Sequence, residues 1–142
     1  MMRQNIVFVE NRAGSLKKVT EIIGEAGINI FGFACFDAPE FAVFRMICDD
    51  ADRAEELLTK HGYMNRITPA IVVDMLDEVR GLDCLLGVVA ESNVSLDYIY
   101  TSYHRAGEVP VAILYSEDAS VTESILKNNG FRVLSSVEEL KK

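Results

Sequence analysis

An internal repeat is the feature that most constrains the fold of this chain of 142 residues. At an offset of 66 residues, apolar positions of the first half fall on apolar positions of the second half without a gap. The matched pairs are Leu16/Leu82, Val19/Leu85, Ile22/Val88, Ile23/Val89, Ile28/Val94 and Ile30/Leu96. At an offset of 68, Asp50-Ala51, Glu55, Leu58 and Gly62 fall on Asp118-Ala119, Glu123, Leu126 and Gly130. Self-similarity at a nearly fixed offset predicts two copies of one supersecondary unit, and the two extra residues belong in a loop.

Each copy has the residue pattern of a β-α-β-β-α-β unit, with helical spacing in the amphipathic segments and β-branched or aromatic runs between them. In the first copy we predict strands over 5–10, 28–36, 41–48 and 63–67, and helices over 15–26 and 51–61. In the second copy we predict strands over 70–76, 94–103, 109–115 and 131–135, and helices over 82–92 and 118–129.

This element order is that of the split βαβ, or ferredoxin-like, unit. Right-handed crossovers then give an antiparallel sheet with both helices on one face. We therefore predict an α+β fold of two ferredoxin-like units in tandem, 1–68 and 69–142. Pro69, which has no N–H, is expected at a strand boundary between them, and the polar tail 136–142 is expected to fray.

The composition excludes several classes of function. The net charge of −8 repels phosphate backbones, which argues against a nucleic-acid partner. The apolar run Ile6–Val9 is too short for a secretory core or a membrane span, so we expect a cytoplasmic protein with no membrane partner. Cys35, Cys48 and Cys84 are odd in number and widely spaced, which favours buried thiols in a reducing compartment over a disulfide framework or a zinc site.

The junction between the first predicted strand and helix is the first candidate site. A helix N-terminus offers unpaired N–H groups and a partial positive charge to a carboxylate or phosphate. Gly14 lets a ligand approach closely, Ser15 is a plausible helix cap, and Asn11 has an oxygen that can accept a hydrogen bond from an ammonium group. Capping of the helix alone explains the same residues, so this interpretation stays open from the sequence.

Glu10–Leu16, followed by about a dozen helical residues and then Gly27-Ile28-Asn29-Ile30, resembles the start of an ACT domain, whose pattern is N-x-P-G-x-L, a helix and G-I-N-[IV]. The resemblance implies a βαββαβ fold, pairing of domains through their sheets, and an amino-acid effector bound at a domain interface. It assigns ligand contacts to a loop and to the start of a strand: Asn11, Ala13, Gly14, Ser15, Leu16, Ile28, Asn29 and Ile30. Ala13 stands where the family has proline, which loosens the turn.

The second copy matches this pattern less well. Asp77 replaces the asparagine, Arg80 stands at the glycine position with Gly81 directly after it, and Asn93-Val94-Ser95-Leu96 replaces G-I-N-I. The resemblance therefore implies a weaker second site at Asp77, Arg80, Gly81, Leu82 and Ser95.

No catalytic constellation and no cofactor motif is found in the sequence. His61 and His104 fall at non-equivalent places in the two copies and lack a metal-ligand pattern. We therefore predict a stand-alone sensor that is not an enzyme, binds a free amino acid, and acts through a partner enzyme or as a homodimer. Two alternatives remain: a small ferredoxin-like enzyme or enzyme subunit, because this fold hosts many functions, and a ligand-free dimerisation module.

Overall fold

The computed structural model describes residues 1–102 and 109–141, and the chain forms two compact units. We call Arg3–Thr68 the N-terminal unit. The C-terminal unit comprises Pro69–Lys142 together with Met1–Met2.

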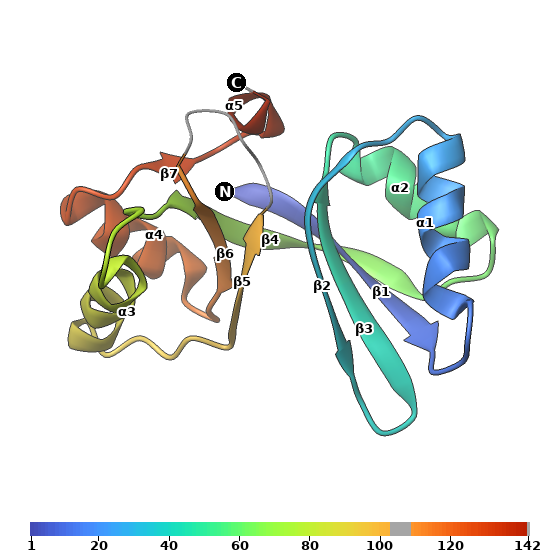
Figure 1. Cartoon of the computed structure of the whole chain (residues 1–142), viewed down its shortest axis with the longest axis horizontal. Coiled ribbons are helices and arrows are strands. Elements are labelled where there is room, and N and C mark those ends of the chain that lie inside the picture. Colours follow the sequence, from blue (N-terminus) through green and yellow to red (C-terminus); the bar gives the residue numbers. More distant parts are fainter. Residues whose placement is uncertain (103–108, 142) are drawn as a thin grey trace. The chain divides into compact units, whose positions relative to one another are not determined.

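The N-terminal unit contains the predicted β-α-β-β-α-β order of elements (Figure 1). Its elements are β1 (Met2–Glu10), α1 (Ser15–Glu25), β2 (Ile30–Asp37), β3 (Phe41–Cys48), α2 (Ala51–Lys60) and the first part of β4 (Asn65–Asp74). Strand β3 pairs antiparallel with both β1 and β2, and β1 also pairs with β4. Since β1 and β2 both run antiparallel to β3, they run parallel to each other and end at the same edge of the sheet.

The core of the N-terminal unit lies between its sheet and its two helices, which cover one face of the sheet. Alternate residues of β1 and β3 point toward the helices, as the period of two in a strand requires. The buried core residues are Val7, Val9, Val19, Ile23, Ile28, Phe44, Met46, Cys48, Ala54 and Leu58.

The C-terminal unit repeats this order with the second part of β4, and it adds one short helix. Its further elements are α3 (Gly81–Glu91), β5 (Tyr98–Ser102), β6 (Val111–Tyr115), α4 (Ala119–Asn128), β7 (Val133–Leu134) and α5 (Val137–Leu140). Strand β6 pairs antiparallel with β4 and β5, and β7 pairs antiparallel with β4. The buried core residues are Ile71, Val73, Leu85, Val89, Ala112, Leu114, Ala119 and Leu126.

Two predictions about the ends of the repeat were wrong. Strand β4 runs through Pro69 without a break, and its pairings with β6 and β7 begin beyond the proline, at Ile71 and Val72. The tail does not fray over its described residues, 136–141: α5 buries Leu140 completely, and Glu139 accepts hydrogen bonds from the backbone N–H and hydroxyl of Ser135.

Glycine ends three of the four long helices, with left-handed φ angles at Gly27, Gly62 and Gly130. After α1, the N–H of Gly27 donates to Gly24 and that of Ile28 donates to Ile23, which satisfies carbonyl groups at the end of the helix. After α4, the N–H of Gly130 donates to the carbonyl of Lys127 at 3.1 Å, and the Asn129 amide donates to Ile125 at 2.8 Å.

The expectation of buried thiols holds only for Cys48. Cys35 and Cys84 are exposed, and all three cysteines are free. Burial raises the pKa of the Cys48 thiol to about 11, and the neighbouring carboxylates of Asp49 and Asp50 add to the rise.

Candidate functional site

The loop between β1 and α1 is built around Gly14. Its φ angle of 83° lies in the left-handed region, where glycine is favoured, and a Cβ added there would meet nothing within 4 Å. Gly14 occupies the position before α1, while Ser15 is the first helical residue and makes no capping hydrogen bond. The prediction that Ser15 caps the helix was therefore wrong, and the first turn of α1 has no side-chain cap. Ala13 is exposed, and Leu16 is half-buried against the core.

Asn11 is held in place by the hairpin that joins β2 to β3. Its Nδ2 donates to Oδ1 of Asp37 at 2.6 Å and to the carbonyl oxygen of Ala38 at 3.2 Å. Both amide hydrogens are therefore used. Among residues 1–102 and 109–141 nothing donates to its Oδ1, which is available as an acceptor.

Ile28, Asn29 and Ile30 lie at the opposite end of the N-terminal unit. Strand β2 has eight residues and therefore spans about 25 Å between this segment and Asp37. Figure 1 shows the α1–β2 connection at the upper end of this unit and the β1–α1 loop at the lower end. Asn29 is exposed, and its backbone exchanges hydrogen bonds with Asp49 at 3.0 and 3.1 Å. The structure therefore does not bring Asn29 and Asn11 together within one unit.

A cavity of about 310 Å³ lies beside the loop, and sequence reasoning missed most of its lining. It is lined by Phe8, Glu10, Arg12, Ser15, Lys18, His61, Gly62, Tyr63 and Met64. Ser15 is its only member among the predicted site residues. Arg12 forms an ion pair with Glu10, and Nδ1 of His61 lies 2.8 Å from the carbonyl oxygen of Leu57.

The equivalent loop of the C-terminal unit has its glycine one position later. Arg80 occupies the left-handed position with φ 70°, and its guanidinium donates to Oδ2 of Asp83 at 2.5 and 2.9 Å. Gly81 is buried, and a Cβ added to it would lie 2.0 Å from the carbonyl oxygen of Leu76. Asp77 and Leu82 are exposed in this region, whereas Ser95 follows the far end of α3.

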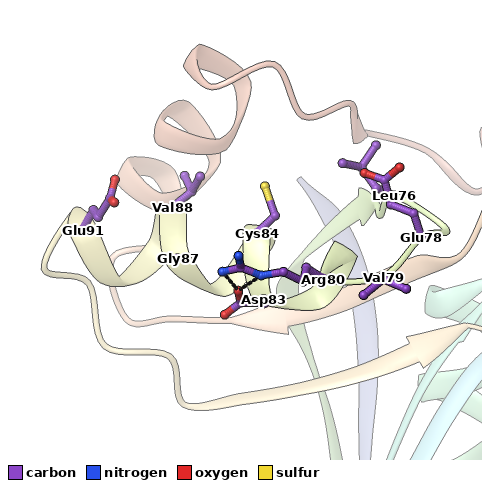
Figure 2. A pocket seen from close by; sticks show the side chains of 9 residues that line it. All are labelled: Leu76, Glu78, Val79, Arg80, Asp83, Cys84, Gly87, Val88 and Glu91. Carbon is purple, nitrogen blue, oxygen red and sulfur yellow. Dashed lines mark hydrogen bonds and ion pairs between the residues drawn. The ribbon is translucent and has the colours of Figure 1, made fainter.

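A larger cavity, of about 540 Å³, lies along α3 (Figure 2). It is lined by Leu76, Glu78, Val79, Arg80, Asp83, Cys84, Gly87, Val88 and Glu91. Figure 2 shows the Arg80–Asp83 pair at the start of the helix and Glu91 toward its other end. Of the second predicted site, Arg80 alone lines this cavity.

Within the described part of the chain, no group of three or more His, Cys, Asp or Glu side chains could hold a metal ion. His104 lies outside the described residues. The described helices include none with the length and apolar character needed to cross a bilayer.

Comparison with solved structures shows several folds of this kind. The chain is similar to protein BT0572 from Bacteroides thetaiotaomicron, with a TM-score of 0.88 and 23% identity over 99% of this chain and 96% of that one. It is also similar to the regulatory subunits of aspartate kinase from Thermus thermophilus and Thermus flavus, with TM-scores of 0.62 and 0.59 and 16% identity to each. These matches cover 90% of this chain and 91% and 92% of those chains. No curated protein matches.

The family model described as "ACT domain pair" matches residues 1–140, almost the whole chain. ACT domains are regulatory modules, so residues 1–140 form regulatory domains with antiparallel sheets and α+β content rather than a catalytic domain. The resemblance seen in the β1–α1 loop is thus confirmed, and the chain belongs to the ACT domain pair family.

Proposed function

We propose that this protein is an amino-acid sensor made of two ferredoxin-like ACT domains, 1–68 and 69–142, with the effector bound at an interface between ACT domains. The observation that carries the proposal is the β1–α1 loop. It presents an uncapped helix N-terminus, a left-handed glycine with open space around it, and an asparagine whose amide oxygen is available.

These three features match the two charged groups of a free amino acid. The N–H of Ser15 donates to the carbonyl of Arg12 at 3.2 Å, so the α-carboxylate would accept hydrogen bonds from the N–H groups that follow it in the first turn of α1, where the helix dipole favours negative charge. The α-ammonium would donate to Oδ1 of Asn11. Ala13, Gly14, Ser15 and Leu16 would form the wall of the site on this side.

The segment Ile28–Ile30 would complete the site from a second ACT domain, because within one unit it lies at the far end of β2. A site that needs two domains links binding to association, either in a homodimer or with a partner enzyme. Binding becomes allosteric regulation when the ligand prefers one association state over the other. The three free cysteines support a reducing compartment such as the cytoplasm.

A thermal-shift screen of the protein against the twenty amino acids tests the proposal. We expect one or a few of them to raise the melting temperature, since a ligand at about one hundred times its Kd stabilises the native state by roughly 2.7 kcal/mol. If none of the twenty has an effect, the proposed function is wrong.

Gly14→Val then tests the location of the site. A branched side chain at the N-terminus of α1 should abolish binding while the far-ultraviolet circular dichroism stays near that of the wild type. Gly130→Val is the matched control, because Gly130 has a similar left-handed φ angle of 87°, is exposed, and also has open space around its Cβ position, but lies at the end of α4. Unchanged affinity in Gly14→Val would place the site elsewhere.

A further inference from the structure

We infer that Asp37, the last residue of β2, belongs to the binding site and receives the ammonium group of the ligand together with Asn11. This inference rests on the proposed function and extends it to a residue in the β2–β3 hairpin.

The placement of Asp37 follows from the topology of the sheet. Because β1 and β2 run parallel on either side of β3, their C-terminal residues lie at the same edge: Glu10 is opposite Phe41, and Asp37 is opposite Ala42. The residue that follows β1 is Asn11, which reaches across this edge to Asp37. The hairpin is itself fixed by a hydrogen bond of 2.8 Å from the N–H of Ala38 to the carbonyl of Phe41.

The hydrogen bonds of the pair leave two acceptors for a ligand. Nδ2 of Asn11 donates to Oδ1 of Asp37 at 2.6 Å and to the carbonyl oxygen of Ala38 at 3.2 Å, so the hairpin engages the amide nitrogen of Asn11 and not its oxygen. In the described part of the chain, Oδ2 of Asp37 accepts no hydrogen bond and no cation pairs with this carboxylate. An ammonium group has three donors and no acceptor, so it can donate to both oxygens at once.

The charges of the site are arranged as a zwitterion requires. Asp37 supplies a full negative charge that the protein leaves unpaired within the described residues, and the N-terminus of α1 supplies a partial positive charge. Gly14 is three residues after Asn11, so the N-terminus of α1 lies at most about 11 Å along the chain from the residue whose side chain holds Asp37. A ligand with only a carboxylate would gain nothing from Asp37 and would be repelled by it.

The test compares two ligands on four proteins by calorimetric titration. The ligands are the amino acid that the thermal screen selects and its analogue without the α-amino group. The proteins are the wild type, Asp37→Asn, Asp37→Ala and Glu40→Gln. Asp37→Asn retains an oxygen that can accept from Asn11 but removes the charge, and Glu40→Gln removes an exposed carboxylate from the same turn as a matched control.

We expect Asp37→Asn to weaken binding of the amino acid about tenfold or more, as loss of a hydrogen bond to a charged group does. Binding of the analogue, measured by displacement where it is weak, should stay the same or improve, and Glu40→Gln should match the wild type. Asp37→Ala also frees Asn11, so its amino-acid affinity should be at least as low as that of Asp37→Asn.

If Asp37→Asn weakens both ligands equally, Asp37 only supports the hairpin and the inference is wrong. Unchanged affinity for the amino acid would also overturn it, while the proposed function stands. If the wild type binds no amino acid, the proposed function and the inference fail together.

Discussion

The two units need glycine in their equivalent loops for different physical reasons. In the N-terminal unit the requirement is torsional: Gly14 has a φ angle of 83° and open space around its Cβ position. In the C-terminal unit the requirement is steric: Gly81 has ordinary helical geometry, but a Cβ would lie 2.0 Å from the carbonyl oxygen of Leu76. In this unit the residue with the left-handed backbone conformation is Arg80, with a φ angle of 70°. Only the N-terminal loop therefore leaves room beside its glycine for a ligand.

The cavities beside the two loops also differ in charge. At the offset of 66 residues, Arg12 corresponds to Glu78 and Lys18 to Cys84, and each residue of both pairs lines its own cavity. The N-terminal cavity thus has cationic side chains where the C-terminal cavity has an acid and a thiol. The two units share one backbone fold, but their cavities suit ligands of different charge. Binding of a ligand to one unit therefore does not imply that the other unit binds it.

Replacing each glycine by alanine separates the two requirements. Gly81→Ala forces a methyl group into the backbone carbonyl of Leu76 and should lower the free energy of unfolding by about 3 kcal/mol. Gly14→Ala should lower the free energy of unfolding by about 1–2 kcal/mol, because alanine disfavours the left-handed backbone conformation at this position. Urea unfolding monitored by circular dichroism measures both, and equal losses would show that the two loops are constrained in the same way.

The inequality of the predicted sites is tested by Asn29→Ala and Ser95→Ala, which truncate equivalent positions. Asn29→Ala should weaken binding of the selected amino acid about tenfold or more, because it removes one or two hydrogen bonds to a charged group. Ser95→Ala should change the affinity by less than about threefold. If Ser95→Ala is the more damaging in calorimetric titration, the assignment of the main site to the N-terminal unit is wrong.

The cysteines give a contrast in pH dependence. The pKa of Cys48 is raised from an ordinary value of 9.0 to about 11, so the folded protein keeps this proton after the unfolded chain has lost it. The free energy of unfolding should therefore be unaffected by titration of this thiol below about pH 9 and should fall as the pH rises toward 11. Denaturant midpoints across this range should fall less steeply for Cys48→Ala, whereas Cys84→Ala should follow the wild type. A slope unaffected by Cys48→Ala would assign the alkaline loss to other groups.

The smallest effect is expected for Arg80→Gly. Glycine removes the left-handed penalty at this position, but it adds chain entropy to the unfolded state and removes the exposed Arg80–Asp83 pair. These terms nearly cancel, so the free energy of unfolding should change by less than about 1 kcal/mol. A larger gain in the urea titration would show additional strain at Arg80.

Much of the N-terminal loop was predictable because local chemistry determines it. Gly14 and Gly27 appear in the sequence just before and just after an amphipathic run, and both have the left-handed angles that such positions favour. The exact cap was not predictable: Ser15 could equally precede or begin the helix, and the backbone places it inside α1.

Contacts between distant segments account for what the sequence analysis missed. The Asn11–Asp37 hydrogen bond joins residues 26 positions apart. The predicted topology already placed β1 and β2 parallel to each other. The closeness of Asn11 and Asp37 could therefore have been predicted from the sequence. The cavity residues Tyr63 and Met64 and the burial of Leu140 depend on side-chain packing, which residue patterns do not resolve.

The end of α4 has a consequence for the chemical ageing of the protein. Asn-Gly sequences form succinimides when the glycine nitrogen attacks the asparagine side chain, and the products are aspartate and isoaspartate. At Asn129-Gly130 the fold engages both reacting groups, because the glycine N–H donates to Lys127 and the asparagine amide donates to Ile125. Isoaspartate at this position should therefore form only as fast as the end of α4 unfolds locally. The isoaspartate content of stored protein would then report the rate of that local unfolding.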